Sequence, residues 1–348
     1  MVGWATFRLS YCKIQQFALH RSPMPVSARA RFDWRLSNRT LALGQRTLLM
    51  GILNVTPDSF SDGGRFLSPD AALNHALQML DDGADILDLG GESTRPTSVP
   101  ITPAEEQARV LPVLCAILAA RPNTILSIDT YHAETARQAV EAGAEIVNDV
   151  SGHLWDPAMS ATCAALGCGN VLMHTRGRPH EWRTQPALVP SQVLPFVLRD
   201  LEARTHAALA AGIARSSIVL DPGFGFGKIL DENYPLLAHL DQLRALSFPI
   251  LAGLSRKSFL TRTLIFTPGG AVSGNPARRG GPGAPHLRVT GEPGAPHLDS
   301  EMWDSSLPTT TVANTAAILA GAHILRVHDI RPARQTAVLA DRILASSE

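Results

Sequence analysis

Short apolar runs recur along the chain, and most precede a stretch with the periodicity of an amphipathic helix. Eight runs are apolar at nearly every position, which is typical of parallel strands covered on both faces. After the seventh run the helix signal is weaker and interrupted. The expected strands are Leu48–Asn54, Asp85–Gly90, Thr124–Asp129, Glu145–Asp149, Asn170–His174, Ile218–Asp221, Pro249–Gly253 and Ile324–His328.

The expected helices include 69–82, 103–120, 133–142 and 191–211, and glycine follows several helix ends. A strand–helix unit repeated eight times in about 300 residues predicts a single (β/α)8 TIM barrel of class α/β. Two Rossmann-like halves would instead require a glycine fingerprint after the first strand. The sequence GILNVTPD at 51–58 contains no such fingerprint.

Two segments do not follow this repeat. Residues 1–31 contain no Asp or Glu, and we expect a non-structural extension, with a transit peptide or a true start at Met24 as alternatives. The barrel is expected to comprise 32–348. Within it, residues 267–308 are assigned to a low-complexity insertion, because 267–298 are crowded with Gly and Pro and contain PGAPHL twice. A disordered insertion is favoured over a functional lid.

The overall charge excludes some classes of partner. Lys plus Arg and Asp plus Glu each number 31, so nothing electrostatic favours nucleic acid or an anionic membrane. No apolar run reaches the roughly 18 residues of a membrane span. Four cysteines are too few for a disulfide scaffold and indicate a reducing compartment. We expect a cytoplasmic protein, or an organellar one if residues 1–31 are a transit peptide.

Polar residues stand at the end of every expected strand. In barrels of this kind, catalytic residues gather at the carboxyl ends of the strands. One such residue is often only a helix cap, but eight polar strand ends together favour a functional site. They are Asn54, GGESTRP at 90–96, Asp129, Asn148 with Asp149, Met173 with His174, Asp221, SRKS at 255–258 and RVHD at 326–329.

Some rival chemistries fail on spacing. GLSRK at 253–257 has Lys257 where a nucleophile elbow requires glycine. PGFGFGKI at 222–229 has Pro222 and Ile229 where a phosphate-binding loop requires glycine and a hydroxyl side chain. No zinc motif is present.

The strand ends divide by chemistry into two groups. Asp129, Asn148 and Asp221 offer acceptors that suit a flat heterocycle with a guanidine-like edge, and Met173, Phe224 and Phe226 could wall its ring. The second group is cationic and suits a phosphate or pyrophosphate. It comprises Arg95, Arg256, Lys257, Arg326 and His328.

Seven motifs in this order resemble the dihydropteroate synthase family of folate biosynthesis. The resemblance runs from about Arg39 to the C-terminus and excludes the Gly/Pro insertion. It implies condensation of 6-hydroxymethyl-7,8-dihydropterin pyrophosphate with p-aminobenzoate to give 7,8-dihydropteroate and pyrophosphate. It also implies Mg2+ as cofactor and a homodimer. The motifs are GILNVTPDSFSDGG, DLGGESTRP, SIDT, IVNDVSG, DPGFGFGK, SRKS and RVHD.

The resemblance also implies a role for individual residues. Pterin is bound by the residues that match Asp129, Asn148, Asp221 and Lys257, with Met173 and Phe226 along its ring. Pyrophosphate is held by Asn54, Arg326 and His328, with Mg2+ near Asn54. Mobile loops contribute Asp58, Thr94 and Arg95, and p-aminobenzoate meets Thr94, Phe226 and Ser258. The implied mechanism is dissociative, and its catalytic residues are Asp129, Lys257, Arg326 and His328.

Two departures from the family pattern are MHTRG at 173–177 and TTT at 309–311. Two alternative functions also stay open at this point. One is a catalytically silent paralogue that binds pterin or a partner protein, and the other is a pterin-dependent methyltransferase domain. The pyrophosphate-binding motifs favour the synthase over the methyltransferase.

Overall fold

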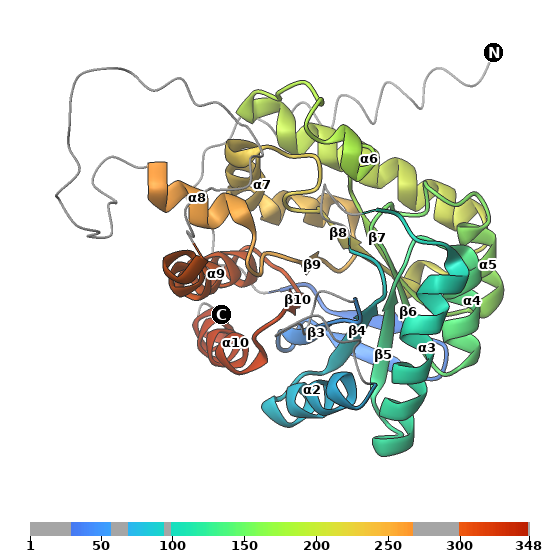
Figure 1. The fold of residues 1–348 in the computed structure, drawn as a ribbon. Coiled ribbons are helices and arrows are strands. Elements are labelled where there is room, and N and C mark those ends of the chain that lie inside the picture. The colour runs from blue at the N-terminus through green and yellow to red at the C-terminus, as the bar shows by residue number, and fades with distance from the viewer. Residues whose placement is uncertain (1–28, 57–68, 94–98, 267–298, 347–348) are drawn as a thin grey trace, which may run out of the picture.

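The computed structural model describes residues 29–56, 69–93, 99–266 and 299–346 (Figure 1). Eight parallel strands pair in the order β8-β7-β6-β5-β4-β3-β10-β9, and a parallel bridge between Leu220 and Ile250 joins the two ends of this sheet. The predicted TIM barrel is confirmed. The strands are β3 (Leu48–Asn54), β4 (Ile86–Gly90), β5 (Ile125–Asp129), β6 (Ile146–Asp149), β7 (Gly169–Met173), β8 (Ile218–Asp221), β9 (Leu251–Ala252) and β10 (Ile324–Val327).

Helices surround the strand ring (Figure 1). The four helix ranges expected from the sequence are α2, α3, α4 and α6, each within one residue of the expected ends. Helix α9 begins at Asp299, so residues 299–308, expected in the insertion, are helical. The helices are α2 (Pro69–Asp82), α3 (Pro103–Ala120), α4 (Ala133–Glu141), α5 (Met159–Leu166), α6 (Pro190–Ala210), α7 (Asn233–Ala238), α8 (Ser258–Phe266), α9 (Asp299–Leu319) and α10 (Ile330–Ala345).

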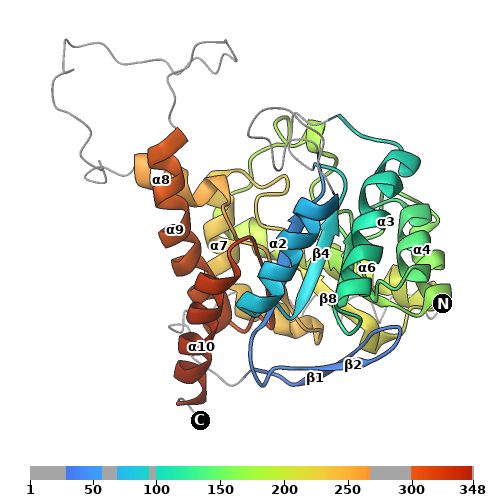
Figure 2. The ribbon, with the colours of Figure 1, turned by 60° about the horizontal axis from the view of Figure 1, so that its bottom comes forward.

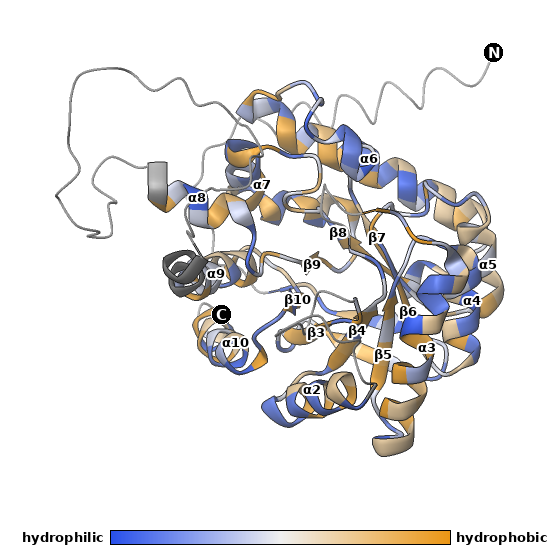
Figure 3. Ribbon diagram, viewed as in Figure 1, coloured by the Kyte–Doolittle hydropathy of each residue, from blue (hydrophilic) through white to orange (hydrophobic). Residues whose placement is uncertain are grey.

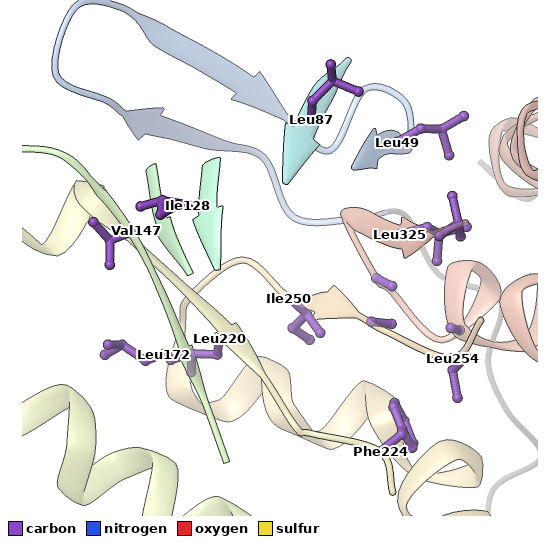
Figure 4. Close-up of a cluster of buried hydrophobic side chains, with 14 of the residues drawn as sticks. Leu49, Leu87, Ile128, Val147, Leu172, Leu220, Phe224, Ile250, Leu254 and Leu325 are labelled. Carbon is purple, nitrogen blue, oxygen red and sulfur yellow. The ribbon is translucent and has the colours of Figure 1, made fainter. Parts of the chain in front are cut away.

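Strand side chains alternate between the helix layer and the barrel interior. Those that face the helices are aliphatic and form the main core, with Leu49, Leu87 and Ile128 on three successive strands (Figure 4). The ribbon coloured by hydropathy shows the same division, with apolar strands inside and polar helix surfaces outside (Figure 3). Such burial on both faces explains why the strands were visible as continuous apolar runs.

A hairpin, β1 (Phe32–Arg35) paired with β2 (Thr40–Leu43), crosses one end of the barrel (Figure 2). Trp34 is fully buried there, and its indole Nε1 donates to the carbonyl of Ser217 at 3.1 Å. Its ring packs among the lowest interior residues of the strands, Met50 and Ile146 among them. The hairpin therefore closes the amino end of the ring and leaves the carboxyl end for the site.

Several expectations fall outside the described residues. These are the extension over 1–28, the Gly/Pro-rich 267–298, and the loop residues Asp58, Thr94 and Arg95. Of the helices that the structure describes, none has the length and apolar character to cross a membrane.

Candidate active site

The polar strand ends converge inside the barrel, as the sequence predicts. Glycine at two strand ends makes room for them. A Cβ atom on Gly90 would lie 3.6 Å from Asp129 Oδ2 and 3.8 Å from Asn54 Oδ1. Opposite, a Cβ atom on Gly253 would lie 3.7 Å from Asp221 Oδ2. Below this polar layer the interior is apolar, from Met50 to Ile324. The site is therefore a polar cup on an apolar floor.

Arg326 of β10 links acidic side chains from two other strands. Its Nη2 donates to Asp129 Oδ2 at 2.6 Å, and its Nε donates to Asp88 Oδ2 at 2.6 Å. Asp88 Oδ2 also accepts a hydrogen bond from Asn148 Nδ2 at 2.9 Å. The cation assigned to pyrophosphate is thus bonded to the same carboxylate as the pterin candidate Asn148. The acceptor and cationic groups are interleaved rather than separate.

Burial dominates the titration of the two candidate pterin carboxylates. It raises the pKa of Asp129 to about 7, against the charge of Arg326 and with the help of Asp88. It also raises the pKa of Asp221, although the N–H of Gly223 and the charge of Lys257 act in the opposite direction. Both groups would gain from a ligand that donates hydrogen bonds and carries positive character.

Lys257 and Phe226 meet across the mouth of the cup. The Nζ atom lies 4.0 Å from the centroid of the Phe226 ring, within cation–π range. Burial and the charge of Arg326 lower the pKa of Lys257 to about 8. Phe226 packs against a small apolar cluster that includes Met173 and Tyr131, as the expected ring walls require. Phe224 does not, because it is fully buried in the core on the helix side (Figure 4).

His328 lies beside Ser255, with 3.0 Å between its Nδ1 and the Ser255 hydroxyl. Burial, together with the charges of Arg256 and Arg326, lowers the pKa of His328 to about 3. The expectation of a cationic His328 therefore does not hold without ligand, because the ring is neutral. Arg256 is paired with Asp329 at 2.6 Å at the rim, and Ser258 is exposed at the start of α8.

The glycine loop after β8 passes close to the end of β7. A Cβ atom on Gly223, which has a φ of +66°, would lie 1.9 Å from the carbonyl oxygen of His174, so only glycine fits. The buried Lys228 donates to the carbonyl of Gly223 at 2.7 Å. This lysine stabilises the loop from within and leaves Lys257 as the lysine of the mouth.

A family model described as pterin binding enzyme matches residues 50–328. A dihydropteroate synthase of Synechocystis is 37% identical over 322 residues, which cover 92% of this chain and 95% of the relative. The chain belongs to the dihydropteroate synthase family. It is therefore a transferase of folate synthesis.

Solved dihydropteroate synthases share the fold. The Xanthomonas albilineans enzyme with 4-aminobenzoic acid is 34% identical, with a TM-score of 0.72 over 91% of this chain and 99% of that one. The same enzyme in complex with 7,8-dihydropteroate is also 34% identical, with a TM-score of 0.69 over 91% and 99%. Small-molecule ligands are thus known for close structural relatives.

Three residues of this dihydropteroate synthase family member were not found from the sequence. Asp88 is fully buried at the centre of the network, and although it begins the motif DLGGESTRP and is the one charge in the apolar strand ILDLG, it was given no role. Tyr131 donates its hydroxyl hydrogen to Glu92 at 2.8 Å beside the mouth. Glu92 lies in the segment GGESTRP, but no pattern in the sequence signalled its contact with Tyr131.

The oxygen ligands at the strand ends can meet only part of the coordination that Mg2+ requires. In the described parts of the chain, no three His, Cys, Asp or Glu side chains are grouped as a metal site. Mg2+ commonly takes few protein oxygens and completes its shell with substrate phosphates and water. The amide oxygen of Asn54, half-buried at the end of β3 and close to Asp129, fits that requirement.

Proposed function

We propose that this chain joins 6-hydroxymethyl-7,8-dihydropterin pyrophosphate to p-aminobenzoate, releasing pyrophosphate and 7,8-dihydropteroate. One observation carries the proposal: Asp129, Asn148 and Asp221 lie at the same end of the strand ring, where Arg326 is bonded to Asp129 and its charge acts on Asp221. A pterin has a guanidine-like edge that donates parallel N–H bonds, and carboxylates accept such pairs. Membership of the family supports this choice of heterocycle.

The pterin would lie on the apolar floor with its ring against Met173 and Phe226. Lys257 at the mouth would donate to a ring carbonyl, because its ammonium already lies over Phe226. Asp129 would accept hydrogen bonds from the pterin while it remains bonded to Arg326. Ser258, which is exposed and follows Lys257, would contact p-aminobenzoate at the rim. Asp58, Thr94 and Arg95 are proposed to complete the site.

Pyrophosphate would meet Asn54, Arg326 and His328. A Mg2+ ion held by Asn54 would supply neutralisation of phosphate charge. Arg326 can serve the phosphate without leaving its carboxylates, since a guanidinium has five N–H donors. The neutral His328 donates one hydrogen bond from its ring and gains basicity as the anion approaches, because a nearby negative charge raises the pKa of a histidine.

The proposed mechanism is dissociative. Ser255 is the hydroxyl beside His328 Nδ1, but its oxygen also accepts the backbone N–H of His328 at 3.2 Å, so we assign it to orienting the ring rather than to covalent attack. The bond between the pterin methylene carbon and the pyrophosphate oxygen breaks first, and Arg326 and His328 stabilise the leaving charge. Asp129 stabilises the methylene cation. The amine of p-aminobenzoate then attacks that carbon and loses a proton to water.

We also propose that the protein is a cytoplasmic homodimer. Exposed apolar side chains lie on two neighbouring helices, with Val312 of α9 71% exposed and Leu339 of α10 66% exposed. Exposed apolar side chains on neighbouring helices are a feature of subunit contacts when they form one patch. Light scattering of the wild type and of Val312→Glu should give a dimer and a monomer. A monomeric wild type would contradict the dimer.

The function is tested with purified protein, Mg2+, the pterin pyrophosphate and labelled p-aminobenzoate. Labelled dihydropteroate is the expected product. A silent paralogue would bind pterin without forming the product. A methyltransferase domain would bind methyltetrahydrofolate and would not respond to pyrophosphate. Two results would support the assigned ion site. Product formation should stop when Mg2+ is chelated, and the Asn54→Ala variant should require a higher Mg2+ concentration.

A further inference from the structure

Asp88 has no assigned role, yet it occupies the centre of the polar cup. It is fully buried in the middle of β4, and its Oδ2 accepts hydrogen bonds from both Asn148 and Arg326. Its other oxygen, Oδ1, is buried without a hydrogen-bond partner. A carboxylate in such surroundings costs free energy unless it is paired. The partners of Asp88 are Asn148 and Arg326, the residues proposed above to bind the pterin and the pyrophosphate.

The contact with Asn148 fixes the orientation of that amide. An ionised carboxylate can only accept, so the NH2 group of Asn148 must turn toward Asp88. The carbonyl oxygen of Asn148 is then the group left for a ligand. Without Asp88, the amide could turn over at little cost and present a donor where the ligand also donates.

The contact with Arg326 fixes the position of the cation. The 2.6 Å bond from Nε holds the inner edge of the guanidinium, while Nη2 reaches Asp129. Arg326 is thereby shared between two carboxylates. When a pterin binds to Asp129, the bond to Asp88 would still hold Arg326 in place, where its other N–H groups can bind the phosphate.

We propose that Asp88 is a positioning residue, which orients the Asn148 amide for the pterin and anchors Arg326 for the pyrophosphate. This inference rests on the proposed function and adds a residue to it. Asp88 acts through its two neighbours and need not touch the substrate. The arrangement favours a ligand in which a flat heterocycle donates two parallel N–H bonds and also carries a phosphate group.

The test compares Asp88→Asn with Ser127→Ala as the matched control. Ser127 pairs with Asp88 across β4 and β5, is equally buried, and its hydroxyl also has no hydrogen-bond partner. For Asp88→Asn we expect the Kd of the bare pterin alcohol and the KM of the pterin pyrophosphate each to rise about 10- to 100-fold. Ser127→Ala should change both less than about threefold.

A double-mutant cycle separates positioning from simple support of the fold. If Asp88 acts through Asn148, the losses in Asp88→Asn and Asn148→Ala overlap, and the double variant is little worse than either single one. Fully additive losses would overturn the orienting role. Pterin affinity of Asp88→Asn within about twofold of the wild type would overturn the whole inference.

A second readout follows the charge of Asp129. The charged groups around it include Arg326, Lys257, Asp88, Glu106 and Asp149. Removing the Asp88 charge frees Arg326 for Asp129, so the acid limb of kcat/KM should move to lower pH in Asp88→Asn. A structural defect alone would leave that limb in place, and an unmoved limb would contradict the anchoring role.

If Asp88→Asn does not fold, Asp88→Ser takes its place, since its hydroxyl can still accept a hydrogen bond in the freed volume. The Kd of the pterin alcohol and the KM of the pterin pyrophosphate are then measured for this variant, with the same thresholds. Failure of the proposed function is recognised separately, because the wild type would then form no dihydropteroate, whereas binding of the pterin alcohol would still test the role of Asp88.

Discussion

The ammonium of Lys257 lies over the face of Phe226, with 4.0 Å between Nζ and the ring centroid. The pair brings together the loop after β9 and the glycine loop after β8. Phe226 is thus both a wall for a flat ring and a partner for the cation beside it.

The titration of Lys257 should limit activity at high pH. Its pKa is lowered to about 8, chiefly by burial, so the ammonium is lost as the pH rises through that value. We expect kcat/KM for the pterin pyrophosphate to fall above about pH 8. In Phe226→Leu the limb should move to lower pH, because a cation–π contact favours the charged form. A pH-independent rate between pH 7 and 9.5 would contradict this assignment.

Replacing Arg326 should damage both parts of the site. Arg326→Ala leaves Asp88 and Asp129 without their shared cation, and loss of one partner of a buried pair commonly costs about 3–5 kcal/mol. We expect lower turnover and also weaker binding of the bare pterin alcohol, by about tenfold or more. Arg256→Ala, at the exposed rim, should change the affinity for the pterin alcohol less than about threefold. Calorimetry measures the affinity of both variants for the pterin alcohol. An unchanged affinity in Arg326→Ala would show that the acceptor group and the cationic group act independently.

That prediction differs from the one the sequence alone supports. The sequence separates acceptors from cations, because it shows residue types and strand ends but not which residues meet across the ring. Arg326 reaches Asp129 because the curved sheet brings the end of β10 toward that of β5, although β3 and β4 separate the two strands in the sheet. Asp88 was missed for the same reason. The strands themselves were predictable, since burial on both faces leaves continuous apolar runs.

The sequence was also misleading about Phe224 and did not reveal the β1–β2 hairpin. The residues Phe224 and Phe226 looked equivalent as ring walls, but the loop directs the first into the core and the second toward Met173. The β1–β2 hairpin was missed because each of its strands fully buries one side chain, so neither forms the continuous apolar run by which the barrel strands were recognised.

Asp221→Asn should weaken pterin binding by about 2–4 kcal/mol, because one acceptor of a buried pair becomes a donor facing another donor. The N–H of Gly223 already occupies Oδ1 at 2.7 Å, so Oδ2 is the oxygen left for the ligand. The Kd of the pterin alcohol is the measurement. Asp241→Asn, outside the strand ring, is the matched control. An unchanged Kd would place the pterin elsewhere.

The hairpin should contribute to stability without affecting catalysis. Trp34→Ala removes a fully buried indole and its bond to Ser217, a change that commonly costs about 3–5 kcal/mol. We expect a lower urea midpoint, with kcat and KM near those of the wild type at low temperature. Phe32→Ala, at a partly buried position of the same hairpin, should cost less. A changed KM in folded Trp34→Ala would show coupling between the two ends of the barrel.

His323 should make the fold sensitive to acid. It is buried between the N-terminal segment and β9, where its Nδ1 accepts from the N–H of Ile250 and its Nε2 lies 2.9 Å from the carbonyl oxygen of Ala30. Burial lowers its pKa from 6.5 to about 4. The folded state therefore favours the neutral ring, so its contribution is complete above about pH 6.5 and is lost as the pH falls toward 4.

The slope for one such histidine is about 1.4 kcal/mol per pH unit between the two pKa values. In His323→Gln, which keeps an acceptor and a donor, the free energy of unfolding should fall less between pH 6.5 and 4.5, by roughly 2 kcal/mol. The exposed His206→Gln is the control and should follow the wild type. Urea titrations at several pH values measure the difference, and parallel curves for all three proteins would show that His323 is protonated without cost.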